Sequence, residues 1–228
     1  MRFLLTSSGI SNPSIADALV DLLGKPVDQA TALFIPTGVY AFPGGAHRAW
    51  TAIHGHATIP LCRLGWKSLG LLELTALPTI REENWVPAVR EADALLVWGG
   101  DVLYLTHWLR RSGLADLLPS LNDTVYVGVS AGSIAVTPYN CDAEFNLGFV
   151  PDGSDMAQGA DRALGLVDFT LYPHLNHPDM ADAQLSAIRT WASGIPVPTY
   201  AIDDNTAIKV VDGAAEVISE GDWELIRP

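Results

Sequence analysis

Short apolar runs alternate with amphipathic segments along most of the chain. The apolar runs predict β-strands, which cover residues 2–8, 31–38, 94–100, 124–130 and 169–175. Three segments place their apolar residues at helical spacing, and we expect helices at residues 12–24, 101–114 and 182–194. The last part of the chain predicts further strands at residues 199–203, 207–213 and 214–226, with Asp212-Gly213 as a hairpin turn.

This order of elements indicates an α/β fold. Strands that are apolar throughout and separated by helices are typical of a mainly parallel sheet covered by helices on both faces. In such a sheet the active crevice lies beyond the carboxyl ends of the strands. Gly99-Gly100, Ser130 and His174 each lie at or near a predicted strand end, so we expect them at one edge of the molecule. No linker or repeat interrupts the sequence, and we expect a single domain over residues 1–228.

The charge of the chain narrows the range of partners. The 26 acidic residues outnumber the 13 basic ones and give a formal net charge of −13, which argues against binding of nucleic acid or of anionic membranes. The apolar run at the N-terminus is too short for a signal peptide, and no run approaches the roughly 18 apolar residues of a membrane span. We therefore expect a cytoplasmic protein. Cys62 and Cys141 form no C-x-x-C motif, and nothing in the sequence indicates a metal or another cofactor.

The segment Gly128-Val129-Ser130-Ala131-Gly132 carries the most distinctive chemistry. It has the form G-x-S-x-G, follows a predicted strand and precedes a run of small residues, which is typical of a nucleophile elbow. The two glycines leave room for a sharp turn that exposes the serine hydroxyl. The backbone N–H groups of Ala131 and of Gly100 are suited to form an oxyanion hole. The alternative interpretation is an ordinary strand-to-helix turn with a solvated serine.

A serine nucleophile needs a general base, and the chain has six histidines. His174 directly follows Pro173 at the carboxyl end of a predicted strand, on the same edge of the sheet as Ser130. We therefore favour His174 as the base and keep His177 as the second candidate. The alternative role for His174 is packing within the core.

The base must in turn be oriented by an acidic residue. Asp203 and Asp204 come at the end of the predicted strand 199–203, again on the crevice side of the sheet. Asp142 and Glu144, just beyond the serine, are competing acids, and Asp-Asp-Asn-Thr is also ordinary turn chemistry. With Asp204, the chain order is Ser, His, Asp, whereas α/β-hydrolases have the order Ser, Asp, His. We therefore do not expect an ordinary lipase or esterase.

Several blocks taken together resemble the peptidase E family of serine peptidases, the aspartyl dipeptidases whose relatives include cyanophycinase. The blocks that agree with the family in order and spacing are Gly99-Gly100-Asp101, the elbow at residues 128–132, Pro173-His174-Leu175 and Asp203-Asp204-Asn205-Thr206-Ala207. The resemblance covers residues 2–213. It implies a class I glutamine-amidotransferase-like fold, which is a three-layer α/β sandwich. It also implies a serine peptidase in which Ser130 is the nucleophile, His174 the base and Asp204 the orienting acid, with the N–H groups of Gly100 and Ala131 in the oxyanion hole.

Three positions depart from the family pattern. Val129 replaces a tryptophan, Asp101 takes the place of an asparagine, and no arginine follows His174 until Arg189. The family uses an arginine soon after its catalytic histidine to bind the aspartate of its substrates, so we do not expect strict Asp-X specificity here. Asp101 and His177 are possible substrate-binding residues instead.

We therefore expect a dipeptidase-like serine hydrolase that cleaves short peptides through an acyl-enzyme intermediate. The departures leave two alternatives. One is a non-catalytic or repurposed member that binds a small ligand, and the other is an esterase or amidase that acts on non-peptide substrates. Residues 38–70 are a candidate lid or wall for the site.

Overall fold

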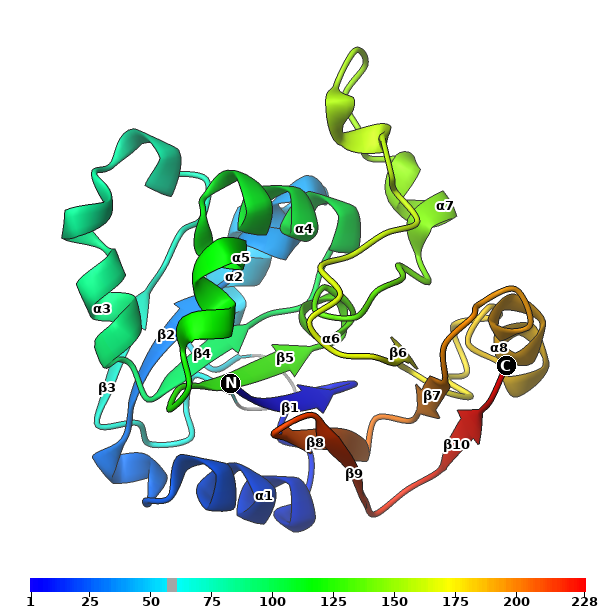
Figure 1. Ribbon diagram of the computed structural model, residues 1–228, viewed down its shortest axis with the longest axis horizontal. Coiled ribbons are helices and arrows are strands. Elements are labelled where there is room, and N and C mark those ends of the chain that lie inside the picture. Colours follow the sequence, from blue (N-terminus) through cyan, green and yellow to red (C-terminus); the bar gives the residue numbers. More distant parts are fainter. Residues whose placement is uncertain (57–60) are drawn as a thin grey trace.

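A computed structural model describes residues 1–56 and 61–228 and shows a central seven-stranded sheet (Figure 1). In spatial order its strands are β3 (Ser68–Leu71), β2 (Thr31–Ile35), β4 (Ala94–Val97), β5 (Val125–Val129), β1 (Arg2–Thr6), β8 (Thr206–Val211) and β9 (Ala214–Ser219). The first five strands are parallel to one another, and β8 and β9 are antiparallel to their neighbours. The mainly parallel sheet expected from the sequence is confirmed.

Helices cover both faces of this sheet. The α-helices of the described residues are α1 (Pro13–Leu23), α2 (Gly45–Ile53), α3 (Val86–Glu91), α4 (Val102–Arg111), α5 (Leu114–Leu117), α6 (Ala131–Ile134), α7 (Ala143–Leu147) and α8 (Leu185–Ala192). Of these, α7 and α8 lie away from the central sheet (Figure 1). In Figure 1, α1 lies below the sheet, and α4 and α5 lie above it. None of the helices in the described part of the chain combines the length and the apolar character that a membrane span requires.

Successive residues of each central strand point to opposite faces of the sheet and pack into two different hydrophobic cores. Leu4 and Leu96 pack with the apolar side chains of α1 and with Ala52 of α2. Leu5 and Leu95 point to the other face and pack with residues of α3, α4 and α5. Because side chains alternate along a strand, a strand buried on both faces must be apolar at every position. This explains the uninterrupted apolar runs in the sequence.

Local sequence features explain where several elements begin and end. The Asn12 side chain accepts a hydrogen bond from the Ile15 amide at 3.0 Å and caps α1. Gly24 ends that helix in the left-handed conformation, with φ 66°. Asp212 and Gly213 both have positive φ, 50° and 80°, which suits the tight hairpin turn between β8 and β9.

A second, three-stranded sheet was not expected from the sequence. Its strands are β10 (Trp223–Ile226), β7 (Thr199–Ile202) and β6 (Thr170–Tyr172), in that order. The predicted strand at residues 169–175 therefore belongs to this small sheet and not to the central one. The segment 214–226 divides between the two sheets, because β9 pairs with β8 and β10 pairs with β7. In Figure 1 the small sheet lies to the right of the central sheet, next to α8.

Candidate active site

Three polar side chains meet where strands of the two sheets end. Ser130 follows β5 directly, and His174 and Asp204 come two residues after β6 and β7. His174 Nε2 lies 2.9 Å from Ser130 Oγ, and His174 Nδ1 lies 2.7 Å from Asp204 Oδ1. The structure thus brings together the serine, the histidine and one of the acids that the sequence nominated.

Ser130 sits on a strained turn between β5 and α6. Its φ of 49° and ψ of −113° fall outside the regions that a residue with a side chain prefers. The Ser130 amide donates to the Thr6 carbonyl at 3.0 Å, which ties the turn to the end of β1. A Cβ atom at Gly132 would collide with the Val97 carbonyl oxygen, and one at Gly128 would lie 2.8 Å from Ser133 Oγ. Both glycines are therefore required for this turn.

Asp204 is held as a carboxylate. Burial opposes its ionisation, but hydrogen bonds from His174 and Ser7 outweigh burial and lower the pKa of Asp204 well below its ordinary value. An ionised carboxylate only accepts hydrogen bonds, so the proton between Asp204 and His174 belongs to Nδ1. Nε2 of His174 is then an acceptor that faces the hydroxyl of Ser130.

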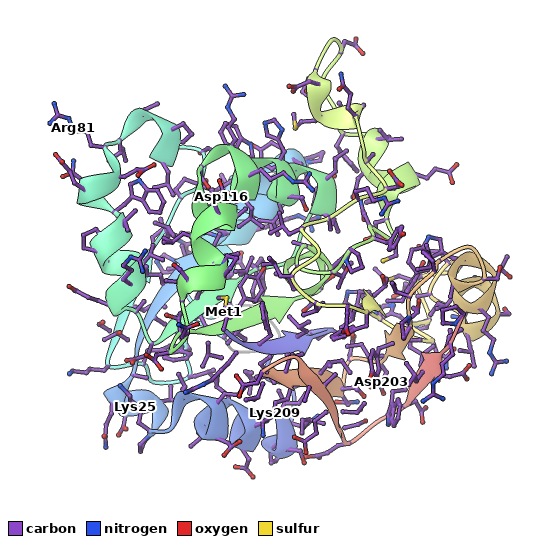
Figure 2. The ribbon with its side chains drawn as sticks, viewed as in Figure 1. Met1, Lys25, Arg81, Asp116, Asp203 and Lys209 are labelled. Carbon is purple, nitrogen blue, oxygen red and sulfur yellow. The ribbon has the colours of Figure 1, made fainter. Side chains whose placement is uncertain are left out.

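The neighbouring Asp203 has a different task. Its Oδ1 accepts hydrogen bonds from the Asn205 amide at 3.0 Å and from Thr206 Oγ1 at 2.7 Å, and its Oδ2 accepts one from the Asp222 amide at 2.8 Å. Asp203 thus stabilises the turn between β7 and β8, near the C-terminal strand (Figure 2). Of the other acids, Asp142 makes no hydrogen bond to His174, and Glu144 is exposed.

Two backbone amides next to Ser130 are available to a ligand. Within residues 1–56 and 61–228, the amides of Gly100 and Ala131 donate to no other protein group. A Cβ atom built on Gly99 would lie 4.0 Å from Ser130 Oγ, so the Gly99-Gly100 backbone passes close to the serine. Gly100 has φ 132°, and a Cβ there would collide with the Gly38 carbonyl group. Only glycine fits this position.

A pocket of about 720 Å³ opens over Ser130 and His174. Phe42, Phe145 and Phe149 form an aromatic wall, with ring centroids 4.8 Å apart for Phe42 and Phe149 and 5.2 Å apart for Phe145 and Phe149. This volume is ordinary for a small-molecule site. The segment proposed as a lid or wall contributes Val39, Phe42, Pro43, Arg48 and Thr51 to the lining.

The lining of the pocket carries charges of both signs. Arg48 is the positive group, and its guanidinium carbon lies 5.7 Å from the centre of the Phe42 ring. Asp142 and Asp182 are the negative groups. Burial raises the pKa of Asp142 to about 6, and the charge of Asp182 adds to this effect. A cationic group of a ligand would relieve that electrostatic cost.

Other candidates from the sequence lie outside the pocket lining. Asp101 is only 1% exposed, and its Oδ1 caps α4 by accepting from the Tyr104 amide at 2.7 Å. His177 Nδ1 accepts from the Asp179 amide, and its ring packs edge-on to His174 at 6.3 Å. Neither side chain lines the pocket, and the substrate-binding role that the sequence suggested for them stays a prediction.

Arg189 is also engaged elsewhere. Its guanidinium makes two hydrogen bonds to Glu224, at 2.8 and 2.7 Å, and it does not line the pocket. The arginine that follows His174 in the sequence therefore cannot bind a substrate in this conformation. The pocket's cation, Arg48, comes instead from α2, which precedes His174 by more than 100 residues.

The described residues offer no group of three or more histidine, cysteine or acidic side chains that is arranged to hold a metal ion. Both cysteines are free thiols. Burial raises the pKa of Cys62 to about 12 and also raises the pKa of Cys141, so both thiols stay protonated at neutral pH.

Buried Asp101 makes the stability of the fold depend on pH. Burial, reinforced by the negative charge of Asp142, raises the pKa of Asp101 to about 6, above the ~3.9 of an unfolded chain. The protonated carboxyl therefore favours folding below about pH 4, and this contribution is lost as the pH rises through about 6. Between pH 4 and pH 8, we expect the free energy of unfolding of the wild type to fall by about 2–3 kcal/mol relative to Asp101→Asn.

Urea unfolding at several pH values measures this difference. Asparagine keeps the Oδ1 acceptor that caps α4 but carries no charge. Asp116→Asn is the matched control, because it removes an exposed carboxylate on α5 (Figure 2), and it should keep the wild-type pH dependence. Parallel stability curves for the wild type and Asp101→Asn would contradict the effect of the buried charge.

The sequence interpretation missed three residues of the candidate site. Ser7 contacts both His174 and Asp204, and Arg48 and Asp182 line the pocket. Ser7 follows β1 at the same sheet edge as Ser130, so the strand-end rule could have nominated it. Arg48 and Asp182 carry no such signal, because they come from segments between strands.

Comparisons with known proteins agree on one family. The model of peptidase family S51 matches residues 3–218. An uncharacterized peptidase of Listeria monocytogenes serovar 1/2a is 27% identical over 149 residues, which cover 62% of this chain and 68% of that protein. An uncharacterized peptidase of Pasteurella multocida is 30% identical over 124 residues. That match covers 52% of this chain and little more than half, 56%, of the relative.

Two crystal structures share the fold of this chain. One, from Listeria monocytogenes EGD-e and provisionally assigned as peptidase E, has a TM-score of 0.68 at 20% identity and covers 96% of this chain and 98% of its own. The other, a peptidase from an acI-B1 Actinobacterium, has a TM-score of 0.61 at 17% identity. The match covers 99% of this chain and 93% of the peptidase. At these identities the likeness is one of fold, and it confirms the α/β sandwich expected from the sequence.

Proposed function

Because the chain belongs to peptidase family S51, we propose that it is a serine peptidase that hydrolyses dipeptides and similarly short peptides through Ser130, His174 and Asp204. One observation carries this proposal. Ser130 Oγ, on a strained turn, lies 2.9 Å from an imidazole nitrogen whose partner nitrogen lies 2.7 Å from a carboxylate. This is the arrangement that activates a serine hydroxyl in unrelated folds.

In the first half of the reaction, Ser130 Oγ attacks the carbonyl carbon of the scissile peptide bond. His174 Nε2 takes the hydroxyl proton as the C–O bond forms, and Asp204 stabilises the resulting imidazolium. The amides of Gly100 and Ala131 donate to the oxyanion of the tetrahedral intermediate. The intermediate then collapses, the C–N bond breaks, and His174 returns the proton to the leaving amine.

In the second half, water replaces the amine. His174 takes a proton from the water as its oxygen attacks the ester carbonyl of the acyl-enzyme, and the same two amides stabilise the second oxyanion. Breaking the ester bond releases the acid product, and the proton on His174 returns to Ser130 Oγ.

The pocket supports a short, doubly charged substrate. A dipeptide at neutral pH carries an ammonium group at one end and a carboxylate at the other. We assign the ammonium to Asp142 and Asp182 and the carboxylate to Arg48, since these are the charged groups of the pocket lining. The aromatic wall of Phe42, Phe145 and Phe149 favours apolar side chains over aspartate. Strict Asp-X specificity is therefore not part of this proposal.

A panel of substrates tests this assignment. We expect hydrolysis of free dipeptides with apolar side chains to exceed that of their N-acetylated or C-amidated forms by about 10-fold or more, because each blocked form loses one charge contact. Hydrolysis of esters or non-peptide amides together with no hydrolysis of any peptide in the panel would favour the esterase or amidase alternative instead.

The Arg48→Gln variant locates the carboxylate contact. It should raise KM for free dipeptides by about 10-fold and leave the rate with C-amidated dipeptides nearly unchanged. Arg81→Gln is the matched control, because Arg81 lies on the surface near α3, far across the molecule from Asp203 and the small sheet (Figure 2). An equal loss on free and amidated substrates would contradict the role assigned to Arg48.

A further inference from the structure

The hydroxyl of Ser7 contacts both His174 and Asp204, the proposed base and the proposed acid. Ser7 Oγ lies 2.6 Å from Asp204 Oδ1, 2.9 Å from the backbone nitrogen of His174 and 3.2 Å from His174 Nδ1. Ser7 directly follows β1 and is fully buried. One hydroxyl therefore touches the main chain and the ring of the proposed base and the carboxylate of the proposed acid.

The chemistry of the partners fixes the direction of these hydrogen bonds. The His174 amide can only donate, so Ser7 Oγ accepts its proton. Ionised Asp204 can only accept, so Ser7 donates its single proton to Oδ1, the oxygen that also accepts from His174 Nδ1. Ser7 has no second proton for Nδ1. Nδ1 therefore keeps its own proton, and Nε2 stays free to accept from Ser130.

Ser7 also holds the backbone of His174 in an uncommon conformation. His174 has φ 60°, in the left-handed region that residues with side chains seldom adopt. The Leu175 amide is tied to the Ile202 carbonyl at 2.9 Å, and the His174 amide is tied to Ser7 Oγ. Without Ser7, the residue that carries the imidazole loses the acceptor of its own amide.

The end of β1 thereby connects the proposed nucleophile with the proposed base. The Thr6 carbonyl accepts from the Ser130 amide at 3.0 Å, and the next residue, Ser7, binds His174 and Asp204. Ser130 follows a strand of the central sheet, whereas His174 and Asp204 follow strands of the small sheet. Residues 6 and 7 are thus a direct link across the two sheets at the site.

We propose that Ser7 is a positioning residue, whose hydroxyl holds the His174 backbone, the His174 ring and the Asp204 carboxylate in line with Ser130. The proposal rests on the proposed serine peptidase function. It assigns Ser7 an effect on the rate of the chemical step and none on substrate binding, since its hydrogen bonds are already made within the protein.

Three variants test this role. Ser7→Ala should lower kcat and the rate of Ser130 labelling by a fluorophosphonate by about 10–100-fold, the range found when residues that orient metal-ligating side chains are lost, with KM within about twofold of wild type. Ser7→Thr keeps the hydroxyl and should restore most of the rate. Ser7→Cys has a similar shape but a poor donor, and it should stay slow. If Ser7→Ala fails to fold, the kcat and the labelling rate of Ser7→Cys test the role of the hydroxyl instead.

The control is Ser112→Ala. Ser112 is also a buried serine whose hydroxyl bonds to the Leu109 carbonyl and the Leu114 amide, at the far end of α4 from Asp101. It should lose stability and keep its turnover number. A folded Ser7→Ala or Ser7→Cys with the wild-type kcat, or a loss in Ser7→Ala that appears only in KM, would overturn the proposal.

Amide hydrogen exchange separates this proposal from the proposed function. In Ser7→Ala the His174 amide should exchange at least about 10-fold faster, whereas the Ser130 amide, bound to Thr6, should be unchanged. A wild-type protein that neither reacts with the probe nor cleaves peptides would refute the function. Exchange would still report whether Ser7 holds His174, and an unchanged His174 amide would overturn the positioning role.

Discussion

Ser130→Ala is expected to lower kcat for peptide hydrolysis by about 10⁵–10⁶-fold while leaving the fold intact. The hydroxyl is the only group of Ser130 that takes part in the reaction, and alanine can keep the tie from its amide to the Thr6 carbonyl. The oxyanion amides and the pocket remain, so KM should change little. Steady-state kinetics with a free dipeptide, together with thermal unfolding, measure both effects.

Ser112→Ala serves as the control for Ser130→Ala as well, because it deletes a buried serine hydroxyl far from the pocket. It should lose about 1 kcal/mol of stability and no catalytic rate. A Ser130→Ala protein that keeps more than about 1% of the wild-type kcat would show that another group is the nucleophile. In that case the hydrogen bond between Ser130 and His174 would be only structural.

Asp204→Asn is expected to lower kcat by about 10³–10⁴-fold. The amide can donate to His174 Nδ1, which would leave the proton of the imidazole on Nε2, the nitrogen that must accept from Ser130. The variant also removes the negative charge that stabilises the imidazolium. Because the pKa of Asp204 lies well below its ordinary value, wild-type Asp204 should remain ionised throughout the pH range of activity.

Asp203→Asn is the matched control for the acid, because it makes the same change one residue earlier. Asp203 bonds to the backbone and to Thr206 in the turn before β8, so the variant should lose stability and keep its kcat within about threefold. A large loss of kcat in Asp203→Asn and none in Asp204→Asn would assign the orienting role to the other aspartate.

The sequence was most informative where burial constrains every residue. The central strands β2, β4 and β5 are covered on both faces, so their runs of apolar residues predicted a parallel sheet. The sheet in turn predicted a site at the strand ends, and Gly128 and Gly132 pointed to the serine because a turn this sharp needs small residues. His174 followed from its place after a strand.

The remaining features depend on contacts between distant segments. The three residues of β6 are as buried as a central strand, so burial alone did not reveal that they belong to a second sheet. Asp203 and Asp204 are identical in type and adjacent, and only their partners distinguish them. Arg48 reaches the pocket from α2, and no motif around it in the sequence indicated that it belongs to a site.

The most direct measurement of the central claim is the intact mass of the protein after incubation with a fluorophosphonate. We predict one adduct on the wild type, no adduct on Ser130→Ala, and greatly slowed labelling of His174→Ala. This result would establish Ser130 as a serine activated by His174. An unlabelled wild type that is correctly folded, or an adduct that persists in Ser130→Ala, would contradict the account.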